Sequence, residues 1–347
     1  MKVVAALGGN ALLERGEPPD SDIQESHIAR AAAALSPMLH EHDVIITHGN
    51  GPQVGVLAVE SAGDPSLSHP YPLDVLGAQT QGMIGYWLVQ ALERAAIQEA
   101  ARRGAAEHGA AHGGRAAKPA VCLICRTLVK ADDPAFAEPA KFVGPVYDQA
   151  TASRLAAARG WEMHRDGRAW RRVVPSPEPA GLVELDMIRL LAGRGVTVIC
   201  AGGGGVPVVA DEAGGFRGVE AVVDKDLTAA LLAQEVGADA LLLLTDVAAV
   251  QDGYGTRDSR PIRRATPAQL RGRLRAGAFP AGSMGPKVEA ACRFAAATGG
   301  LAAIGCLGDA QALLDGTAGT TVRQTTVRQT TVQQTTVQHR TAQTGAS

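Results

Sequence analysis

Glycine-rich turns directly follow short apolar runs at three places in this 347-residue chain. The turns are Gly8-Gly9-Asn10, Gly49-Asn50-Gly51 and Gly202-Gly203-Gly204-Gly205. The preceding runs are typical of parallel strands covered on both faces, and ligands bind at the carboxyl ends of such strands. Glycine there lets the backbone turn its N–H groups toward an anion with no Cβ in the way. One such turn often serves only to reverse the chain, but three together predict a phosphate site.

Two lysines lie at expected helix starts. Asp224-Lys225-Asp226 precedes a helix that begins near Leu227, where the helix dipole also attracts phosphate, and its aspartates can hold the lysine or cap the helix. Ser283-Met284-Gly285-Pro286-Lys287 places a second lysine in the first turn of another helix. Either lysine alone could be solvated, but with the glycine turns they predict a polyphosphate cage suited to phosphoryl transfer. The Walker A pattern is absent from the sequence, so the cradle is of another kind.

A third lysine, Lys141, lies in a segment that departs from the regular order of elements. Residues 130–179 mix proline, tryptophan, glycine and charge, which indicates an excursion from the sheet or a small lid. Lys141 could reach over the site from such a lid. Its spacing alone favours a solvent-facing side chain, because lysines are mostly exposed.

Apolar runs alternate with segments of helical periodicity, which predicts a mainly parallel sheet with helices on both sides. The expected strands are 2–7, 43–47, 120–129, 196–201, 238–247 and 301–306. The expected helices are 21–39, with a capping box at its first four residues, 52–60, 74–97, 182–192, 227–236 and 284–297.

Composition narrows the class of protein. The chain has 33 Lys+Arg and 35 Asp+Glu, a net charge of -2, and therefore lacks the basic footprint of a nucleic-acid-binding protein. No apolar span is long enough to cross a bilayer, and the first apolar run is too short for a signal segment. The five cysteines indicate reduced thiols in a cytoplasmic protein, with Cys122 and Cys125 in the core rather than at a redox or metal site.

Two segments carry no clear fold signal. Residues 104–118 are rich in glycine and alanine and indicate a solvated loop, so His108 and His112 are not expected to bind a metal. Residues 323–347 continue a five-residue Thr-Thr-Val repeat that matches neither the helical nor the strand period, and disorder is expected there. The first copy, from Thr320, can complete the last strand.

The order and the residues of these segments resemble those of the carbamate kinases in the amino-acid kinase superfamily, from residue 1 to about 322. The stretches that carry the resemblance are Ala6 to Ala11, His48 to Gly55, Pro72 to Asp74, Gln81 to Tyr86, Lys141 to Pro145, Trp170 to Pro177, Gly202 to Pro207, Gly218 to Asp226 and Ser283 to Lys287. Ala248 and Lys130 depart from the pattern, since these kinases often carry an acid at both positions.

This resemblance implies a three-layer αβα sandwich on an open, mainly parallel eight-stranded sheet, with a small protruding lid subdomain at about 130–179, in a cytoplasmic homodimer. It also implies reversible transfer between carbamoyl phosphate plus ADP and carbamate plus ATP, with Mg²⁺, running toward ATP in the breakdown of arginine or another carbamoyl-phosphate source. The N-terminal half would hold the phosphoacceptor, and about 196–322 the nucleotide. Two alternatives are a related kinase for another small carboxylate and a non-catalytic nucleotide-binding sensor.

The resemblance also implies roles for individual residues, and it favours a lid position for Lys141 over a solvent-facing one. The catalytic residues would be Lys141, Lys225, Asp226 and Lys287. The substrate-binding residues would be Gly8, Gly9, Asn10, Gly49, Asn50 and Gly51. The nucleotide-binding residues would be Gly203, Gly204, Asp224, Thr245, Asp246, Ser283 and Met284. No residue is assigned to a metal.

Overall fold

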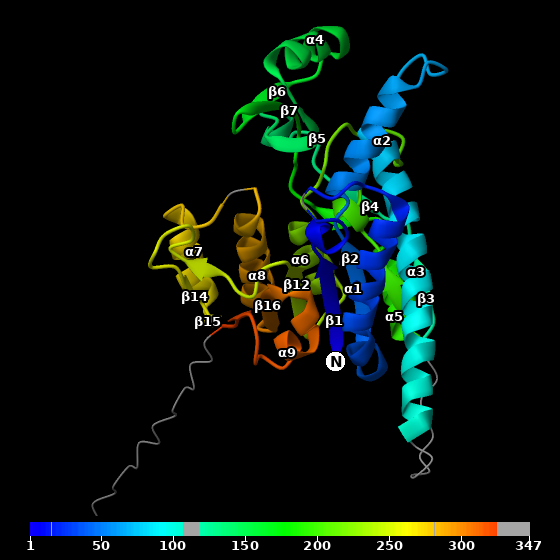
Figure 1. Cartoon of the computed structure of the whole chain (residues 1–347), viewed down its shortest axis with the longest axis vertical. Coiled ribbons are helices and arrows are strands. Elements are labelled where there is room, and N and C mark those ends of the chain that lie inside the picture. Colours follow the sequence, from blue (N-terminus) through cyan, green and yellow to red (C-terminus); the bar gives the residue numbers. More distant parts are fainter. Residues whose placement is uncertain (15, 107–117, 281, 325–347) are drawn as a thin grey trace, which may run out of the picture.

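A large central sheet lies between two layers of helices, and a smaller subdomain stands out from one end of it (Figure 1). The computed structural model describes residues 1–14, 16–106, 118–280 and 282–324. The three-layer α/β architecture expected from the sequence is confirmed.

The central sheet has eight strands in the order β15-β17-β16-β12-β1-β2-β9-β3. Every neighbouring pair is parallel except β16 and β17. The strands are β1 (Lys2–Leu7), β2 (Asp43–His48), β3 (Ala120–Cys122), β9 (Thr197–Ile199), β12 (Ala240–Thr245), β15 (Arg264–Ala265), β16 (Leu301–Cys306) and β17 (Thr320–Val322). The first copy of the repeat supplies the last strand, β17, which lies between β16 and β15, and residues 325–347 lie outside the described residues.

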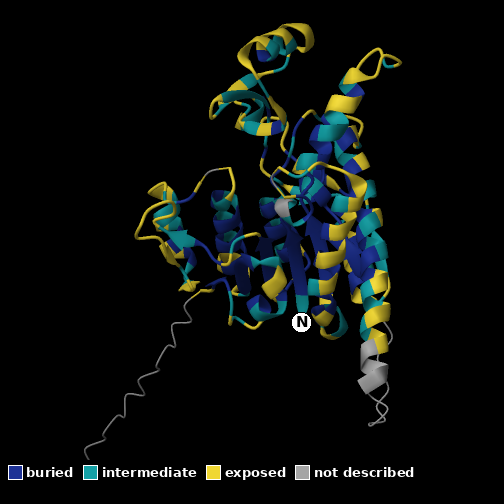
Figure 2. Cartoon of the chain, in the orientation of Figure 1, coloured by how far each residue is buried: buried dark blue, intermediate teal, exposed yellow. Residues whose placement is uncertain are grey.

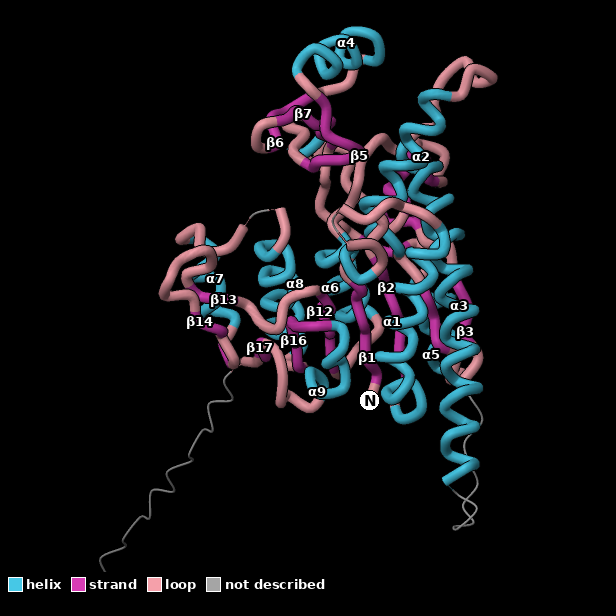
Figure 3. The backbone as a smooth tube through the Cα atoms, viewed as in Figure 1, coloured by secondary structure: helices cyan, strands magenta, loops and turns pink. Residues whose placement is uncertain are grey.

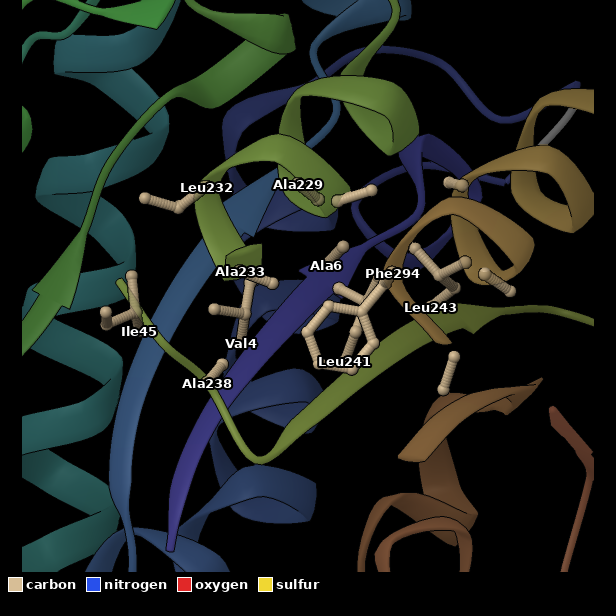
Figure 4. Close-up of a cluster of buried hydrophobic side chains, with 14 of the residues drawn as sticks. Val4, Ala6, Ile45, Ala229, Leu232, Ala233, Ala238, Leu241, Leu243 and Phe294 are labelled. Carbon is tan, nitrogen blue, oxygen red and sulfur yellow. The ribbon is translucent and has the colours of Figure 1, made fainter. Parts of the chain in front are cut away.

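Helices cover both faces because successive side chains of a strand point to opposite sides. Val4 and Ala6 of β1 belong to the cluster packed by α5, α6 and α8, and Figure 4 shows them among residues such as Phe294. Val3 and Ala5 belong to the opposite cluster, packed by α1, α3 and α9. The helices are α1 (Ser21–Glu41), α2 (Gly51–Gly63), α3 (Leu73–Ala106), α4 (Gln149–Arg159), α5 (Leu185–Gly193), α6 (Lys225–Glu235), α7 (Pro267–Arg275), α8 (Met284–Thr298) and α9 (Ala310–Leu314).

The protruding subdomain, called the lid below, is the antiparallel sheet β5-β7-β6 with helix α4 (Figure 3). Its strands are β5 (Lys141–Tyr147), β6 (Met163–Asp166) and β7 (Ala169–Val174). Most lid residues are exposed or half-buried, in contrast to the central sheet (Figure 2). The lid rests on α2, where a Cβ added to Gly55 would lie 3.1 Å from the Cα of Gly144. The expected excursion is therefore a folded unit with its own sheet.

A further sheet in the body of the molecule was not expected from the sequence. It has four strands in the order β11-β10-β4-β8, and a short hairpin pairs β13 with β14. The strands are β4 (Arg126–Leu128), β8 (Gly181–Leu182), β10 (Val206–Ala210), β11 (Phe216–Gly218), β13 (Gln251–Asp252) and β14 (Arg260–Pro261).

The expected single strand 120–129 is wrong, because the chain changes sheets within it. β3 ends at Cys122 and β4 begins at Arg126. Between them the side-chain amide of Gln81 bonds the backbone of Cys125 on both sides, donating to its carbonyl at 3.1 Å and accepting from its N–H at 2.9 Å. The amide of Gln81 thus takes over the role of a neighbouring strand where the chain crosses.

The ends of several helices also differ from expectation. The capping box is wrong: Asp20 is the N-cap of α1, and Gln24 donates to the carbonyl of Pro19 at 2.6 Å. Helix α3 continues to Ala106, beyond the expected end at 97, and His108 and His112 lie outside the described residues. Helix α5 begins three residues late because residues 181–182 pair with β4 instead.

Candidate active site

A cleft of about 540 Å³ opens at the carboxyl ends of β1, β2 and β12, beneath the lid. Most of the residues expected from the sequence line it, although they come from distant parts of the chain. The expected residues found there are Gly8, Gly9, Gly49, Asn50, Gly51, Lys141, Gly203, Asp224, Lys225, Asp226, Thr245, Asp246, Ser283, Met284 and Lys287.

Asp226 bridges two lysines at the floor of the cleft. Its Oδ1 accepts from Lys225 Nζ and its Oδ2 from Lys287 Nζ, both at 2.7 Å. Only 5% of the Asp226 side chain is exposed. Burial by itself would raise the pKa of this carboxyl, but the two ammonium groups outweigh burial and hold the pKa well below its ordinary range. Asp226 is therefore ionised and fixes the spacing of the two positive charges.

The two lysines respond differently to this shared partner. Burial lowers the pKa of Lys225 to about 8, against the attraction of Asp226, and repulsion from Lys287 adds to the fall. Burial also acts to lower the pKa of Lys287, but Asp226 prevails and raises it above the ordinary value. Lys287 is thus a permanent cation near neutral pH, whereas Lys225 titrates near pH 8 when no anion is bound.

Lys141 reaches the same cleft from the lid. Its Nζ lies 2.8 Å from Oδ2 of Asp224, the N-cap residue of α6. The Oδ1 of Asp224 accepts from the backbone N–H groups of Asp226 at 2.9 Å and Leu227 at 3.3 Å. The expected cap is confirmed, and the solvent-facing alternative for Lys141 is wrong in this structure.

Gly8 and Gly49, at the ends of β1 and β2, permit close approach, and backbone carbonyls engage their own N–H groups. Gly8 N–H donates to Leu244 O and Gly49 N–H to Leu7 O, both at 2.9 Å. A Cβ on Gly49 would lie 2.9 Å from the N of Gly9 and 3.3 Å from the side chain of Lys225. The absence of side chains at these strand ends lets two backbones and a lysine meet at one point.

Helix N-termini supply further positive potential. Helix α2 begins at Gly51 with proline in its first turn, and the side chain of its N-cap residue Asn50 donates to Thr80 Oγ1 at 2.8 Å instead of capping the helix. The N-cap residue of α8, Ser283, likewise makes no cap with its own side chain. First-turn N–H groups at such ends attract anions.

The third glycine turn packs behind the first two. Gly203 has a φ of 66°, and a Cβ there would lie 2.2 Å from Asn50 Nδ2. Gly204 does not line the cleft; its carbonyl accepts from Thr127 Oγ1 at 2.7 Å and from Thr228 Oγ1 at 3.1 Å. Asn10 lies in the short 3-10 turn Gly9–Ala11, and its side chain is outside the described part of the structure.

His48 is a buried neighbour of the cleft that sequence reasoning missed. Burial lowers its pKa to about 4, and the charge of Lys225 adds to the effect against the opposing bond to Gly49. The ring is therefore neutral, and its Nδ1 donates to the carbonyl of Gly49 at 2.9 Å. Its place directly before Gly49 was the available signal. A Cβ on Gly202 would lie 2.2 Å from this ring, so glycine is needed there.

Other lining residues carried little or no sequence signal. Arg171 of β7 lines the cleft and donates from Nε to Gly144 O at 2.7 Å. An apolar side of the cleft is formed by Val247, Ala249, Tyr254, Phe279 and Met284. Met284 and the end of the strand at Val247 with its following loop were expected beside the nucleotide, whereas Tyr254 and Phe279 were not, because residues on connecting loops have no periodicity that points toward a site.

The described residues hold neither a cluster of metal ligands nor a helix suited to a membrane. There, no three His, Cys, Asp or Glu side chains gather as a metal site. None of the helices in that part of the chain combines the length and apolar character needed to cross a membrane. All five cysteines are free, and burial raises the pKa of Cys122 to about 11.

The comparisons with known proteins agree with this geometry. Residues 1–304 match the sequence profile of the Amino acid kinase family. The chain therefore belongs to the amino acid kinase family, a class of phosphotransferases.

Individual relatives show to which group within the family the chain belongs. The chain is 47% identical to the carbamate kinase of Rhizobium meliloti (strain 1021), with 93% of each chain covered. It is 44% identical to that of Escherichia coli (strain K12), covering 92% of this chain and 98% of the relative. The carbamate kinase from Giardia lamblia bound to AMP-PNP superposes with a TM-score of 0.82 at 37% identity, covering 93% of this chain and 98% of the other. Within the amino acid kinases, the chain belongs to the carbamate kinases.

Proposed function

We propose that the protein catalyses reversible phosphoryl transfer between carbamoyl phosphate plus ADP and carbamate plus ATP. The observation that carries this proposal is the convergence of Lys141, Lys225 and Lys287 on one cleft, with Asp226 spacing two of them. Two anions must meet in this reaction, and fixed cations offset their repulsion.

The transfer needs no general base. An oxygen of the β-phosphate of ADP attacks the phosphorus of carbamoyl phosphate in line, and the bond from phosphorus to the carbamate oxygen breaks. Carbamate leaves as an anion, and the total charge of the reactants equals that of the products. The chain's contribution is to orient both substrates, exclude water beneath the lid and stabilise charge on the transferred group.

Roles follow from position in the cleft. We assign the strand-end turns at Gly8 to Asn10 and Gly49 to Gly51 to the phosphoacceptor, with Lys141 above them. Lys225 and Lys287 would contact the nucleotide phosphates and the transferred phosphoryl group. The residues assigned to the nucleotide are Gly203, Thr245, Asp246, Ser283 and Met284; Gly204, which the sequence placed among them, does not line the cleft. This division gives an N-terminal acceptor half, a lid within about 130–179 and a nucleotide half at about 196–322, leaving 323–347 as a tail outside the kinase domain.

Mg²⁺ fits as a companion of the nucleotide rather than as a resident of the chain. Asp224 and Asp226, both at the floor of the cleft, are engaged by lysines. Mg²⁺ commonly takes most of its ligands from substrate phosphates and water, and when bound it neutralises phosphate charge.

We further propose a cytoplasmic homodimer that forms ATP during the breakdown of arginine or another source of carbamoyl phosphate. The support is the family resemblance and, for the compartment, five unpaired thiols. Light scattering of the purified protein tests the dimer, and a monomer at micromolar concentration would contradict it.

The test of the activity is coupled ATP formation from carbamoyl phosphate, ADP and Mg²⁺, with the wild type beside Lys141→Ala. We expect robust turnover that falls about 100-fold or more in the variant, the usual effect of losing a preorganised contact to developing charge. If the wild type binds ADP yet makes no ATP, the acceptor is another small carboxylate or the protein is a sensor.

A further inference from the structure

The ion pair between Lys141 and Asp224 joins two parts of the molecule across the cleft. Lys141 is the first residue of lid strand β5, and Asp224 lies in the body at the start of α6. Another ion pair joins the same parts away from the cleft: Arg172 of the lid lies 2.6 Å from Glu220. The two pairs can therefore be compared, because only the first involves cleft-lining groups.

The carboxylate of Asp224 is held rigidly before any ligand arrives. Its Oδ1 caps α6 through two backbone N–H groups, so the direction of Oδ2 is fixed by the helix. Only 12% of the Asp224 side chain is exposed, against 33% for Lys141. A fixed, largely buried acceptor thus meets the end of a long side chain that would otherwise sample many rotamers.

The pairing leaves the ammonium group able to bind a second partner. An ammonium carries three N–H donors, and the bond to Asp224 uses one of them. The remaining donors are available to an anion in the cleft that both residues line. Asp224 can therefore stay bound while Lys141 contacts a ligand.

We propose that Asp224 is a positioning residue for Lys141, and that it acts on carbamoyl phosphate through that lysine rather than as a nucleotide ligand. This inference rests on the proposed function and replaces the nucleotide role expected from the sequence. Asp224 holds the lid lysine over the acceptor side of the cleft, so that binding does not have to order a free side chain. If Asp224 instead contacted the nucleotide directly, the action of Lys141 on carbamoyl phosphate would not depend on Asp224.

The experiment is a double-mutant cycle in the full chain with Asp224→Asn and Lys141→Met. Asparagine caps helices about as well as aspartate, so the start of α6 is preserved while the charge is lost. We expect Asp224→Asn to raise the KM for carbamoyl phosphate about tenfold in the wild-type background and less than twofold beside Lys141→Met. Asp224 also faces Lys225 and Lys287. If it acted through those lysines instead, Asp224→Asn would have the same effect with and without Lys141, and that result would overturn the proposal.

Nucleotide binding provides the second arm. The Kd for ADP, measured by calorimetry, should change less than twofold in Asp224→Asn. A large loss of ADP affinity with an unchanged KM for carbamoyl phosphate would assign Asp224 to the nucleotide and overturn the proposal. Glu220→Gln is the matched control, since it removes the charge of the other lid-to-body pair and should leave both constants unchanged.

A third arm needs no turnover, so it separates this proposal from the proposed function. Limited acetylation with acetic anhydride, followed by peptide mass spectrometry, reports the reactivity of Lys141 in the ligand-free protein. We expect Lys141 to react several-fold faster in Asp224→Asn than in the wild type, relative to the exposed Lys130. Equal labelling would overturn the positioning role, whereas an inactive wild type with the labelling difference would contradict only the proposed reaction.

Discussion

Asp226 is the residue through which two of the cleft lysines are held. Its carboxylate is buried between two ammonium groups at 2.7 Å, so each lysine depends on it for its charge and its place. Removing one partner of a buried pair leaves an uncompensated charge, which typically costs about 3–5 kcal/mol of stability. Variants at this centre therefore need a check of folding beside the assay.

The two lysines bound to Asp226 should each be required for turnover. We expect Lys225→Ala and Lys287→Ala to lower kcat by about 100-fold to 1000-fold, because each removes a fixed cation from the transferred charge. Steady-state ATP formation measures this, with circular dichroism to check the fold. Lys130→Ala is the control, since Lys130 is exposed and does not line the cleft. Unchanged turnover in both cleft variants would rule out the lysine cage.

The pH dependence of kcat/KM should report Lys225. Its pKa of about 8 means that the ligand-free enzyme loses this charge as pH rises through 8, so kcat/KM should fall on the alkaline side. A bound phosphate attracts the ammonium and raises its pKa, so kcat should decline only at higher pH. In Lys225→Arg, whose guanidinium does not titrate in this range, the limb near pH 8 should vanish. A limb that persists in Lys225→Arg would assign the titration elsewhere.

Among the elements, the three glycine turns have two different structural roles. Those after β1 and β2 allow backbones to approach at the cleft, while the turn after β9 packs against His48 and Asn50 behind it. Gly204, placed by the sequence among nucleotide ligands, has its carbonyl engaged by Thr127 and Thr228. The turn after β9 supports the loop Gly49 to Gly51, which we assign to the acceptor. Substitutions in this turn should therefore lower the free energy of unfolding.

Gly203→Ala should be strongly destabilising, and Gly214→Ala only mildly so. Both glycines have positive φ, 66° and 82°, which costs a residue with a Cβ about 1–2 kcal/mol. Only at Gly203 would the Cβ also meet a side-chain atom, Asn50 Nδ2, at 2.2 Å, whereas nothing lies within 4 Å at Gly214. Urea unfolding measures the difference, which we expect to exceed about 2 kcal/mol. Equal losses of unfolding free energy in the two variants would mean that the turn at Gly203 rearranges to accept a Cβ.

At the scale of the whole molecule, the cleft is assembled from residues between Gly8 and Lys287 and is covered by a lid tied to the body at several points. One of these ties is the pair between Arg172 and Glu220 at 2.6 Å. The last described strand, β17, lies far along the sheet from β1, with β16 and β12 between them. The C-terminal end of the described chain thus lies away from the strand-end turn of β1 in the cleft.

Truncation after Gln324 should leave kcat and KM unchanged. It removes only residues 325–347 and retains β17 together with the bond from Arg323 N–H to Ala265 O at 3.2 Å. Truncation after Gly319 is the contrasting variant, because it also deletes β17, which pairs with both β15 and β16. We expect the shorter chain to melt at a lower temperature. A folded but inactive Gln324 truncation would show that the tail contributes to catalysis.

The sequence by itself determined the alternation of strands and helices, the strand-end turns and the helix-start lysines, because these depend on neighbouring residues and local periodicity. Strand β16 was expected at 301–306 and is found there. Only the tertiary structure decided where the chain leaves one sheet for another near Cys125, and that Lys141 pairs with Asp224. Those contacts join residues far apart along the chain, and local pattern carries no information about which distant groups will meet. The same reason explains why Arg171, Tyr254 and Phe279 went unrecognised as cleft residues until the strands and loops were placed in space.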